Sequence, residues 1–291
     1  MKQSLCTIVS NEEILPGVWL MWLGAPDIAS SAHPGQFITV RCGDFILRRP
    51  FSIHQVVIAS EAKQSLVALL FRVVGEGTLW LSQRQKGDKL DVLGPLGKGF
   101  SIEPSSGNLL LMAGGMGIAP LVFLAQFVSS QHRVTLVHGT STAKELYPYE
   151  SEGQESKSQL RLATDLPHGF NFIPVTEDGS VGKKGMATDI LPDFLDWADQ
   201  IYACGPAGMY RTMAKMSLSL SLNSSPSKGR GEKLREESIL KKCQVSLEVR
   251  MGCGIGACYG CSINTKGGLR KVCQDGPIFE LKDILWEEVR I

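Results

Sequence analysis

The chain has 291 residues, 43% of them apolar and 20% charged, which is ordinary for a soluble globular protein of roughly two or three domains. Its net charge of +1 is not the excess of positive charge that is typical of proteins that bind nucleic acid or anionic lipid. The first residues, MKQSLCTIVSNEE, lack the apolar stretch of a secretory signal, and we therefore expect a cytoplasmic protein. The uncharged run Leu109–Val128 is long enough for a membrane span, but its central glycines favour a strand, a turn and the start of a helix.

Short apolar and β-branched runs separated by turn signals fill roughly the first third of the chain. The turn signals include Pro16-Gly17 and Gly87-Asp88. The expected strands are Cys6–Val9, Val18–Leu23, Phe37–Arg41, Leu66–Val74 and Lys89–Leu93. Strands at this spacing predict a small antiparallel barrel.

From Asn108 onward, apolar strands alternate with helical stretches. The expected strands are Leu109–Met112, Arg133–His138, Phe172–Val175 and Gln200–Ala203, and the expected helices are Ile118–Val128 and Ala187–Phe194. This alternation predicts a doubly wound parallel sheet. The fold class is therefore α/β plus a β-barrel, with a small C-terminal segment after the sheet.

Two segments interrupt these patterns. The stretch Ser219–Ser238 is rich in serine and then in charge, and we expect it to be disordered or to form an excursion on the surface. The stretch Ile58–Gln64 lies in a predicted hairpin and is expected only to lengthen it. Neither segment contains residues in a pattern that indicates chemistry.

Two motifs in the predicted barrel suit a flavin. Arg49-Pro50-Phe51-Ser52 follows a predicted strand and supplies a guanidinium, an aromatic face and a hydroxyl. Gly75-Glu76-Gly77-Thr78 opens a predicted helix, whose first backbone amides would hold a phosphate. Taken singly, the first could be a turn with a solvated arginine and the second a hairpin loop. Their order across one hairpin strengthens the flavin interpretation.

A glycine-rich motif joins the first strand and helix of the predicted α/β domain. Its sequence is AGGMGIAPL, and Gly114, Gly115, Gly117 and Pro120 are the candidate contacts for a dinucleotide pyrophosphate at the helix start. The alternative is a plain glycine-rich turn.

A second nucleotide motif, Cys204-Gly205-Pro206, closes a later strand at the same predicted sheet edge, where open α/β sheets bind ligands. Its alternative is a tight turn between a strand and a helix. After the second strand of the domain, the run Gly139–Thr142 contains no arginine, and Lys144 is the nearest cation. This favours NAD over NADP.

Four cysteines near the C-terminus indicate an iron–sulfur cluster. Cys253, Cys258, Cys261 and Cys273 have the spacing C-x4-C-x2-C-x11-C, which is typical of plant-type [2Fe–2S] sites. The surrounding glycines permit backbone N–H groups to approach the sulfurs closely.

Zinc remains an alternative occupant, although its sites usually contain two short cysteine pairs. A disulfide framework is a further alternative, but eight cysteines are sparse for a chain of this length. The remaining four are expected to be small buried hydrophobic residues, namely Cys6, Cys42, Cys204 and Cys243.

The order of these motifs resembles that in the electron transfer subunits of dihydroorotate dehydrogenase B, a ferredoxin-reductase-like family. The shared motifs are R-P-x-S, G-E-G-T, G-P-L-G, G-G-x-G-x-A-P-L, C-G-P and the cysteine pattern. The most specific piece is V-S-L-E-x-R-M-x-C-G-x-G-x-C-x-G-C, which here spans Val245–Cys261. The resemblance covers almost the whole chain except the two interrupting segments, and Ser219–Ser238 departs from the family pattern.

The resemblance implies three cofactors and a partner. The implied FAD contacts are Arg49, Pro50, Phe51, Ser52, Leu70, Phe71, Arg72, Gly77 and Thr78. It also implies that the four C-terminal cysteines ligate a [2Fe–2S] cluster. A partner subunit carrying FMN and the pyrimidine site would pass its electrons through this chain to NAD, in an assembly of two copies of each subunit that serves UMP biosynthesis.

A nicotinamide exchanges two electrons as a hydride whereas an iron–sulfur cluster passes one, so a flavin has to lie between them. We therefore predict a relay of cluster, FAD and NAD, with Ser52 donating a hydrogen bond to flavin N5.

Two rival interpretations are a reductase that feeds an oxygenase, hydrogenase or ferredoxin, and a zinc module on a nucleotide-binding sensor. The predicted divisions are a flavin barrel over 1–103, a NAD domain over 104–216, an insert over 217–240 and a cluster segment over 241–291.

Overall fold

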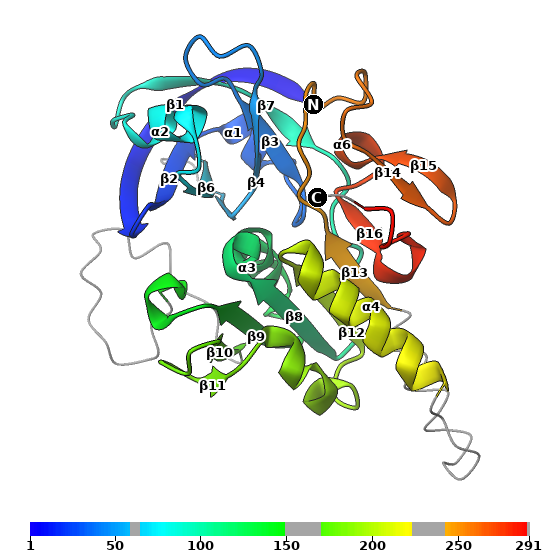
Figure 1. Ribbon diagram of the computed structural model, residues 1–291. Coiled ribbons are helices and arrows are strands. Elements are labelled where there is room, and N and C mark those ends of the chain that lie inside the picture. Colours follow the sequence, from blue (N-terminus) through cyan, green and yellow to red (C-terminus); the bar gives the residue numbers. More distant parts are fainter. Residues whose placement is uncertain (59–64, 149–169, 223–241, 290–291) are drawn as a thin grey trace.

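The computed structural model describes residues 1–58, 65–148, 170–222 and 242–289. Two seven-stranded sheets and one two-stranded sheet make up its strands. Figure 1 shows the N-terminal sheet, in blue and cyan, above the second sheet, in green and yellow, with the C-terminal segment, in orange and red, beside both. The predicted fold class is confirmed.

The N-terminal sheet is antiparallel throughout, with strand order β4-β3-β7-β1-β2-β6-β5. Its strands are β1 (Lys2–Leu15), β2 (Val18–Gly24), β3 (Phe37–Val40), β4 (Arg49–Ser52), β5 (Gln55–Val57), β6 (Leu66–Arg72) and β7 (Lys89–Leu96), with helices α1 (Pro26–Ala29) and α2 (Glu76–Ser82). All five predicted strands are present. The motif Arg49–Ser52 forms strand β4 itself instead of following a strand, and its position at the edge of the sheet tolerates Pro50.

Strands β2 and β6 are apolar on both faces because each face packs against a different core. One face packs on helix α3 and strand β8 through Leu20, Trp22, Ala68 and Leu70. The other face fills the barrel through Met21, Leu23, Val67 and Leu69. The interface between the barrel and the second sheet is therefore largely apolar, which explains the continuous hydrophobic runs in the sequence.

The second sheet has the strand order β11-β10-β9-β8-β12-β13-β16 and is parallel except for β16. Its strands are β8 (Asn108–Gly114), β9 (Arg133–Thr140), β10 (Phe170–Thr176), β11 (Lys183–Lys184), β12 (Gln200–Cys204), β13 (Cys243–Ser246) and β16 (Ile278–Glu280). Its helices are η1 (Gly115–Gly117), α3 (Ile118–Val128), η2 (Ala143–Glu145), η4 (Ala187–Phe194) and α4 (Ala207–Leu222).

Helices cover both faces of this sheet, as the doubly wound pattern predicts. Along β8, Leu109 and Leu111 pack on the side of α3, whereas Leu110 and Met112 pack on the side of α4 and η4. The predicted helix over Ala187–Phe194 is a 3₁₀ helix that contains Pro192. None of the described helices is long and apolar enough to cross a membrane.

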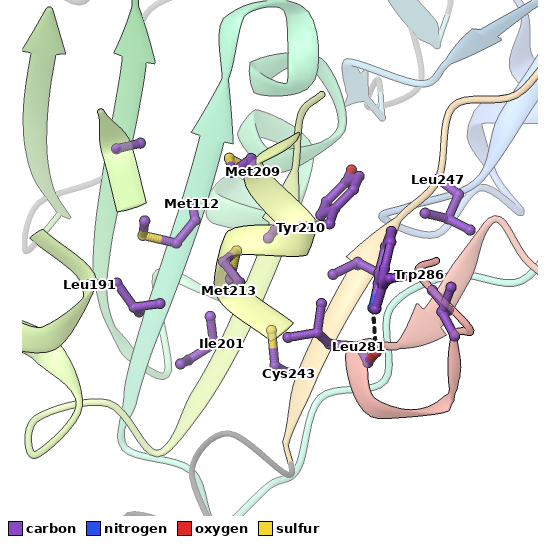
Figure 2. Close-up of a cluster of buried hydrophobic side chains, with 14 of the residues drawn as sticks. Met112, Leu191, Ile201, Met209, Tyr210, Met213, Cys243, Leu247, Leu281 and Trp286 are labelled. Atoms are coloured by element: carbon purple, nitrogen blue, oxygen red, sulfur yellow. Dashed lines mark hydrogen bonds between the residues drawn. The ribbon is translucent and has the colours of Figure 1, made fainter. Parts of the chain in front are cut away.

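The C-terminal segment contributes strands to the second sheet as well as a small sheet of its own. It contains β14 (Ser262–Thr265), β15 (Gly268–Lys271), α6 (Val272–Asp275) and η5 (Leu281–Asp283) between β13 and the chain end. Figure 2 shows the buried cluster that joins it to α4, in which the rings of Tyr210 and Trp286 lie 5.2 Å apart. The Trp286 indole donates to the carbonyl of Leu281 at 2.9 Å.

The two interrupting segments fall mainly outside the described residues. Helix α4 extends through Leu222, so the first residues of the stretch Ser219–Ser238 are helical. The rest of that stretch, and residues 59–64 of the predicted hairpin extension, lie outside the described ranges. The four predicted domain ranges remain predictions.

Candidate functional site

The four C-terminal cysteines come together as two pairs of thiols. The Cys253 and Cys258 side chains are hydrogen-bonded to each other, and so are those of Cys261 and Cys273. The first pair lies at the surface, whereas Cys261 and Cys273 are buried. All eight cysteines of the chain are free, and the four outside this pattern are buried as predicted.

The four cysteines lie in the cysteine loop, residues 247–277 between β13 and β16, and backbone N–H groups of this loop point at their sulfurs. Gly256 donates to the Cys273 sulfur at 3.1 Å, and Ala257 donates to the Cys253 sulfur at 3.2 Å. Burial raises the pKa of Cys253, but hydrogen bonds from Ile255, Cys258 and Ala257 outweigh it and lower this pKa to about 6. Cys253 therefore favours the thiolate form that a metal ligand needs, whereas burial raises the pKa of Cys273 to about 12.

The loop has the backbone shape that a close wrap around a cluster requires. Gly254 and Gly256 have φ values of 71° and 83°, and a side chain on Gly256 would overlap Gln274. The Lys271 ammonium donates to the carbonyl of Gly256 at 3.0 Å and lies 4.7 Å from the centre of the Tyr259 ring. The chain therefore holds the loop in place with its own side chains.

The cysteine loop packs directly against the barrel. A Cβ atom on Gly254 would lie 3.0 Å from the Thr39 side chain in β3. Phe37 and Leu96 of the barrel belong to the same buried cluster as Cys261 and Cys273. Further along, the amide of Lys98 donates to the carbonyl of Gly276 at 2.6 Å.

The structure brings the two barrel motifs together. A Cβ atom on Gly77 would lie 2.8 Å from Nε of Arg49, so the guanidinium of β4 rests on the first turn of α2. Thr78 accepts from the amides of Val74 and Gly75 at 2.9 and 3.1 Å, and its hydroxyl therefore caps the start of α2.

The three candidate residues of β6 face different surroundings. Leu70 faces the second sheet, whereas Phe71 faces the barrel core, 5.7 Å from the ring of Phe51. The Arg72 guanidinium lies 3.6 Å from a Glu145 carboxylate oxygen, but its buried Nε has no partner among the described residues. A buried donor of this kind fits a bound acceptor group such as a flavin or its phosphates.

The two nucleotide motifs also meet in space, at the carboxyl edge of the parallel sheet. A side chain on Gly117 would overlap the carbonyl of Cys204, and a Cβ on Gly114 would lie 2.8 Å from Pro206. Gly115 has a φ of 52°. Helix α3 begins at Ile118 without a side-chain cap, because its N-cap residue is Gly117. This arrangement suits a pyrophosphate at the start of α3. Pro120 is buried in the first turn of α3.

A carboxyl beside this edge has no role in the sequence-based prediction. Glu248 follows β13 and accepts from the Cys204 thiol at 3.9 Å. Burial raises the pKa of Glu248, and the hydrogen bond with Cys204 only partly offsets this rise. Its position could have been inferred from the sequence, since it follows a strand at the same edge as Cys204.

The end of β9 presents carboxylates instead of cations. The hydroxyl of Ser141 donates to Glu177 at 3.1 Å, and the Ser141 amide donates to Glu145 at 3.3 Å. Lys144 lies in η2, next to Glu145. In this class of sheet, a carboxylate here suits a ribose hydroxyl, and an arginine suits a phosphate.

Two family models match the chain. The iron–sulfur cluster binding domain of dihydroorotate dehydrogenase B matches residues 248–285, and the oxidoreductase NAD-binding domain matches residues 111–215. The first range contains all four clustered cysteines. The second contains both nucleotide motifs and begins within strand β8.

Relatives resemble the chain over nearly its full length. It is 36% identical to a protein of Desulforamulus reducens, covering 94% of this chain and 95% of that one. It is 31% identical to a protein of Caldanaerobacter subterraneus, covering 96% and 97% respectively. Both are named dihydroorotate dehydrogenase B (NAD(+)), electron transfer subunit.

Solved structures support the same fold. The structure of an NADH-dependent reduced ferredoxin-NADP oxidoreductase is 28% identical, with a TM-score of 0.73 over 98% of this chain and 91% of that one. A ferredoxin NADP+ reductase from Neisseria gonorrhoeae is 18% identical, covers 79% of this chain and 95% of its own, and shares the fold with a TM-score of 0.56. The chain therefore belongs to the family of electron transfer subunits of dihydroorotate dehydrogenase B.

Proposed function

We propose that this chain passes electrons from an FMN-containing dihydroorotate dehydrogenase subunit, through a [2Fe–2S] cluster and FAD, to NAD+ in cytoplasmic pyrimidine biosynthesis. The observation that supports this most directly is the position of the cysteine loop. The loop packs on the barrel through Gly254, and its flanking strands β13 and β16 belong to the parallel sheet. A one-electron site is thus built against both a flavin-type barrel and a nucleotide-type sheet.

Cys253 and Cys258 would ligate one iron, and Cys261 and Cys273 the other. This division follows from the two hydrogen-bonded thiol pairs, and a [2Fe–2S] cluster has four cysteine ligands. The amides that already point at Cys253 and Cys273 would stabilise the negative charge of the ligated sulfurs. The zinc interpretation has no comparable support, since the matching family model is an iron–sulfur one.

The FAD would lie along β4 and β6, where the barrel faces the second sheet. We assign its pyrophosphate to Arg49 and the amides of Gly77 and Thr78, and its ring to the edge formed by β4 and the β6 residues Leu70–Arg72. The orphaned Nε of Arg72 supports a polar group at this place.

NAD would bind across the sheet edge formed by the glycine loop, Gly114–Gly117, and the turn Cys204–Pro206. The contact between Gly117 and the carbonyl of Cys204 joins the two motifs into one surface. When bound, the three groups supply two-electron exchange at the nicotinamide, one-electron exchange at the cluster, and both at the flavin between them. The residues named here hold and orient those groups.

The partner would carry the FMN and the dihydroorotate site, in an assembly of two copies of each subunit. The alternative, a reductase that feeds an oxygenase, hydrogenase or ferredoxin, is less well supported because the cluster region matches the dihydroorotate dehydrogenase B model.

Anaerobically purified full-length chain should contain about one FAD and about two irons, with a [2Fe–2S] EPR signal after dithionite reduction. NAD+ should be reduced by dihydroorotate only when an FMN-containing partner is added. Dihydroorotate oxidation by the chain alone, or a colourless protein, would refute the proposal.

Replacing Ser52 with alanine is expected to slow NADH-driven flavin reduction. Ser52 ends β4 and is half-buried, and we propose that its hydroxyl donates to flavin N5. Removing one preorganised hydrogen-bond donor typically costs about 100-fold in rate, and we expect a loss of about that size in this step. The measurement is anaerobic stopped-flow bleaching of the flavin at saturating NADH. Ser10→Ala, at a half-buried strand serine of the same sheet, should leave the rate unchanged. An unaltered rate in Ser52→Ala with full FAD occupancy would exclude the role.

NADH is expected to reduce the flavin with a much lower KM than NADPH. The 2′-phosphate of NADPH would meet the carboxylates of Glu145 and Glu177 near Ser141. Glu177→Lys should lower the KM for NADPH and raise that for NADH, whereas Glu287→Lys, which also changes an exposed carboxylate, should alter neither. The KM values for NADH and NADPH are measured from the steady-state reduction of an electron-accepting dye. Equal KM values in the unmodified protein would contradict the proposed ribose contact.

A further inference from the structure

A line of buried polar side chains crosses the interface between the barrel and the second sheet. It consists of His54, Tyr147 and His138, which are 0%, 5% and 1% exposed. His54 follows the flavin-motif strand β4, His138 lies in β9, and Tyr147 lies just beyond η2. The surrounding residues of this interface are apolar and include Leu20, Trp22, Leu70 and Ile118. These three side chains are absent from the residues assigned to cofactors above.

The hydrogen bonds of His54 fix its tautomer. Nδ1 lies 2.9 Å from the carbonyl oxygen of Ala119, which can only accept, so Nδ1 bears the proton. Nε2 therefore accepts, and the hydroxyl of Tyr147 donates to it at 3.1 Å. The backbone amide of His54 donates to the carbonyl of Ala68 in β6 at 2.9 Å. His54 is thereby tied to the barrel by its backbone and to α3 by its ring.

The hydrogen bonds of His138 fix the opposite tautomer. Its Nε2 donates to the carbonyl of Gly115 at 3.0 Å, and its Nδ1 accepts from the amide of Tyr147 at 3.4 Å. Tyr147 thus joins the two histidines, through its hydroxyl on one side and its amide on the other. The carbonyls to which they bond belong to Gly115, within the glycine loop Gly114–Gly117, and to Ala119, in the first turn of α3.

Both rings remain neutral at physiological pH. Burial lowers the pKa of His54 and of His138 to about 4 each, against small opposing contributions from the carbonyls of Ala119 and Gly115. In each of their hydrogen bonds, the donor and the acceptor therefore stay the same over the working range of pH. A fixed structural connection requires this.

We propose that His54, Tyr147 and His138 form a hydrogen-bonded strap that sets the position of the glycine loop relative to strand β4. The strap makes these three side chains positioning residues for hydride transfer between the nicotinamide and flavin sites, and this role rests on the proposed function. Apolar contacts at the interface attract without direction, whereas the strap bonds require particular angles. The hydrogen bonds of the strap therefore select one arrangement of the barrel relative to the second sheet, among several arrangements that would bury similar apolar area.

Through the strap, these residues affect the distance between the reacting atoms of the nicotinamide and the flavin. His54 is two residues from Ser52, and His138 bonds the carbonyl of Gly115, so each end of the strap adjoins a residue assigned to a cofactor. A misplacement of about 1 Å between reacting atoms costs roughly 100-fold in rate. Loss of the strap should therefore reduce the rate of flavin reduction at saturating NADH more than it weakens NADH binding.

The test compares two tyrosine-to-phenylalanine variants of the full-length holoprotein. Tyr147→Phe removes the hydroxyl that bonds His54. Tyr202→Phe removes an equally buried hydroxyl, which donates to the carbonyl of Ser101 at 3.1 Å outside the strap. Each variant loses the hydroxyl hydrogen bond named here, worth about 1 kcal/mol, and both should have lowered Tm values. Only Tyr147→Phe should show a fall of about tenfold or more in the flavin reduction rate at full FAD occupancy.

Hydrogen exchange provides a second readout that does not depend on catalysis. Amides of residues 113–120 should exchange faster in Tyr147→Phe than in the unmodified protein, and should be unchanged in Tyr202→Phe. If Tyr147→Phe does not fold, His54→Asn and His54→Leu replace it. Asparagine can still donate to the carbonyl of Ala119, so it should protect these amides better than leucine.

Unchanged exchange at residues 113–120 in Tyr147→Phe would overturn the strap. An equal loss of the flavin reduction rate in both tyrosine variants would also overturn it. So would a loss that is fully explained by a lower FAD content. If NADH fails to reduce the flavin of the unmodified holoprotein, the proposed function fails, and the exchange measurement still decides whether the strap holds the loop.

Discussion

Replacing Cys273 with alanine is expected to remove the cluster and stop electron transfer to or from the partner, while NADH still reduces the flavin. Cys273 is buried, its sulfur accepts from the amide of Gly256 at 3.1 Å, and its thiol is paired with that of Cys261. The sequence contains no fifth cysteine between Cys253 and Cys273, so the iron that this pair would hold loses one of its ligands. Iron content and the EPR signal of the reduced protein should both fall to background.

The matched control is Cys6→Ala, which removes an equally buried thiol in β1 of the barrel. It should keep the cluster signal, the FAD and the rate of flavin reduction by NADH. Retention of a full cluster signal in Cys273→Ala would show that the four proposed ligands are wrong. Loss of NADH-driven flavin reduction in a variant that retains its FAD would show that the order of the relay is wrong.

Replacing Gly117 with alanine is expected to abolish productive NADH binding. The added methyl group would overlap the carbonyl of Cys204, and that carbonyl belongs to the end of a buried strand that pairs with β8 and β13. Overpacking of this kind costs about 1–3 kcal/mol, and here the yielding part is the glycine loop itself. We expect kcat/KM for NADH to fall by roughly 100-fold or more, because the loop would be displaced from the pyrophosphate.

Gly208→Ala provides the comparison, since a Cβ at Gly208 would meet nothing within 4 Å. This glycine lies in helix α4, where alanine should be neutral or stabilise the fold by about 0.4–1 kcal/mol. Both variants should retain FAD and the cluster signal. An unchanged kcat/KM in Gly117→Ala would argue against nucleotide binding at the contact of the two motifs.

Features determined by local sequence were predictable. The helix Ile118–Val128 has the predicted ends, because a glycine turn precedes it and its apolar run is continuous. The cysteine loop was also predictable, since the spacing of its first three thiols is set within one short segment. Strand β1, by contrast, runs from Lys2 to Leu15, beyond the apolar core Cys6–Val9, because pairing with β2 and β7 also orders its polar ends.

Features that depend on distant contacts were not predictable. Strand β16 has only three residues, and its pairing with β13 determines its register. His54, Tyr147 and His138 are isolated polar residues in sequence, and nothing in their spacing indicates that they meet.

The placement of the cysteine loop between β13 and β16 bears on how such proteins can evolve. Many redox modules are joined by a tether and can be exchanged between enzymes by recombination at that tether. Here both ends of the cysteine loop continue into strands of the nucleotide sheet, and β13 is hydrogen-bonded to β12 along its length. Cutting the gene before β13 would deprive the sheet of both β13 and β16, so this electron carrier and its scaffold have to be inherited together.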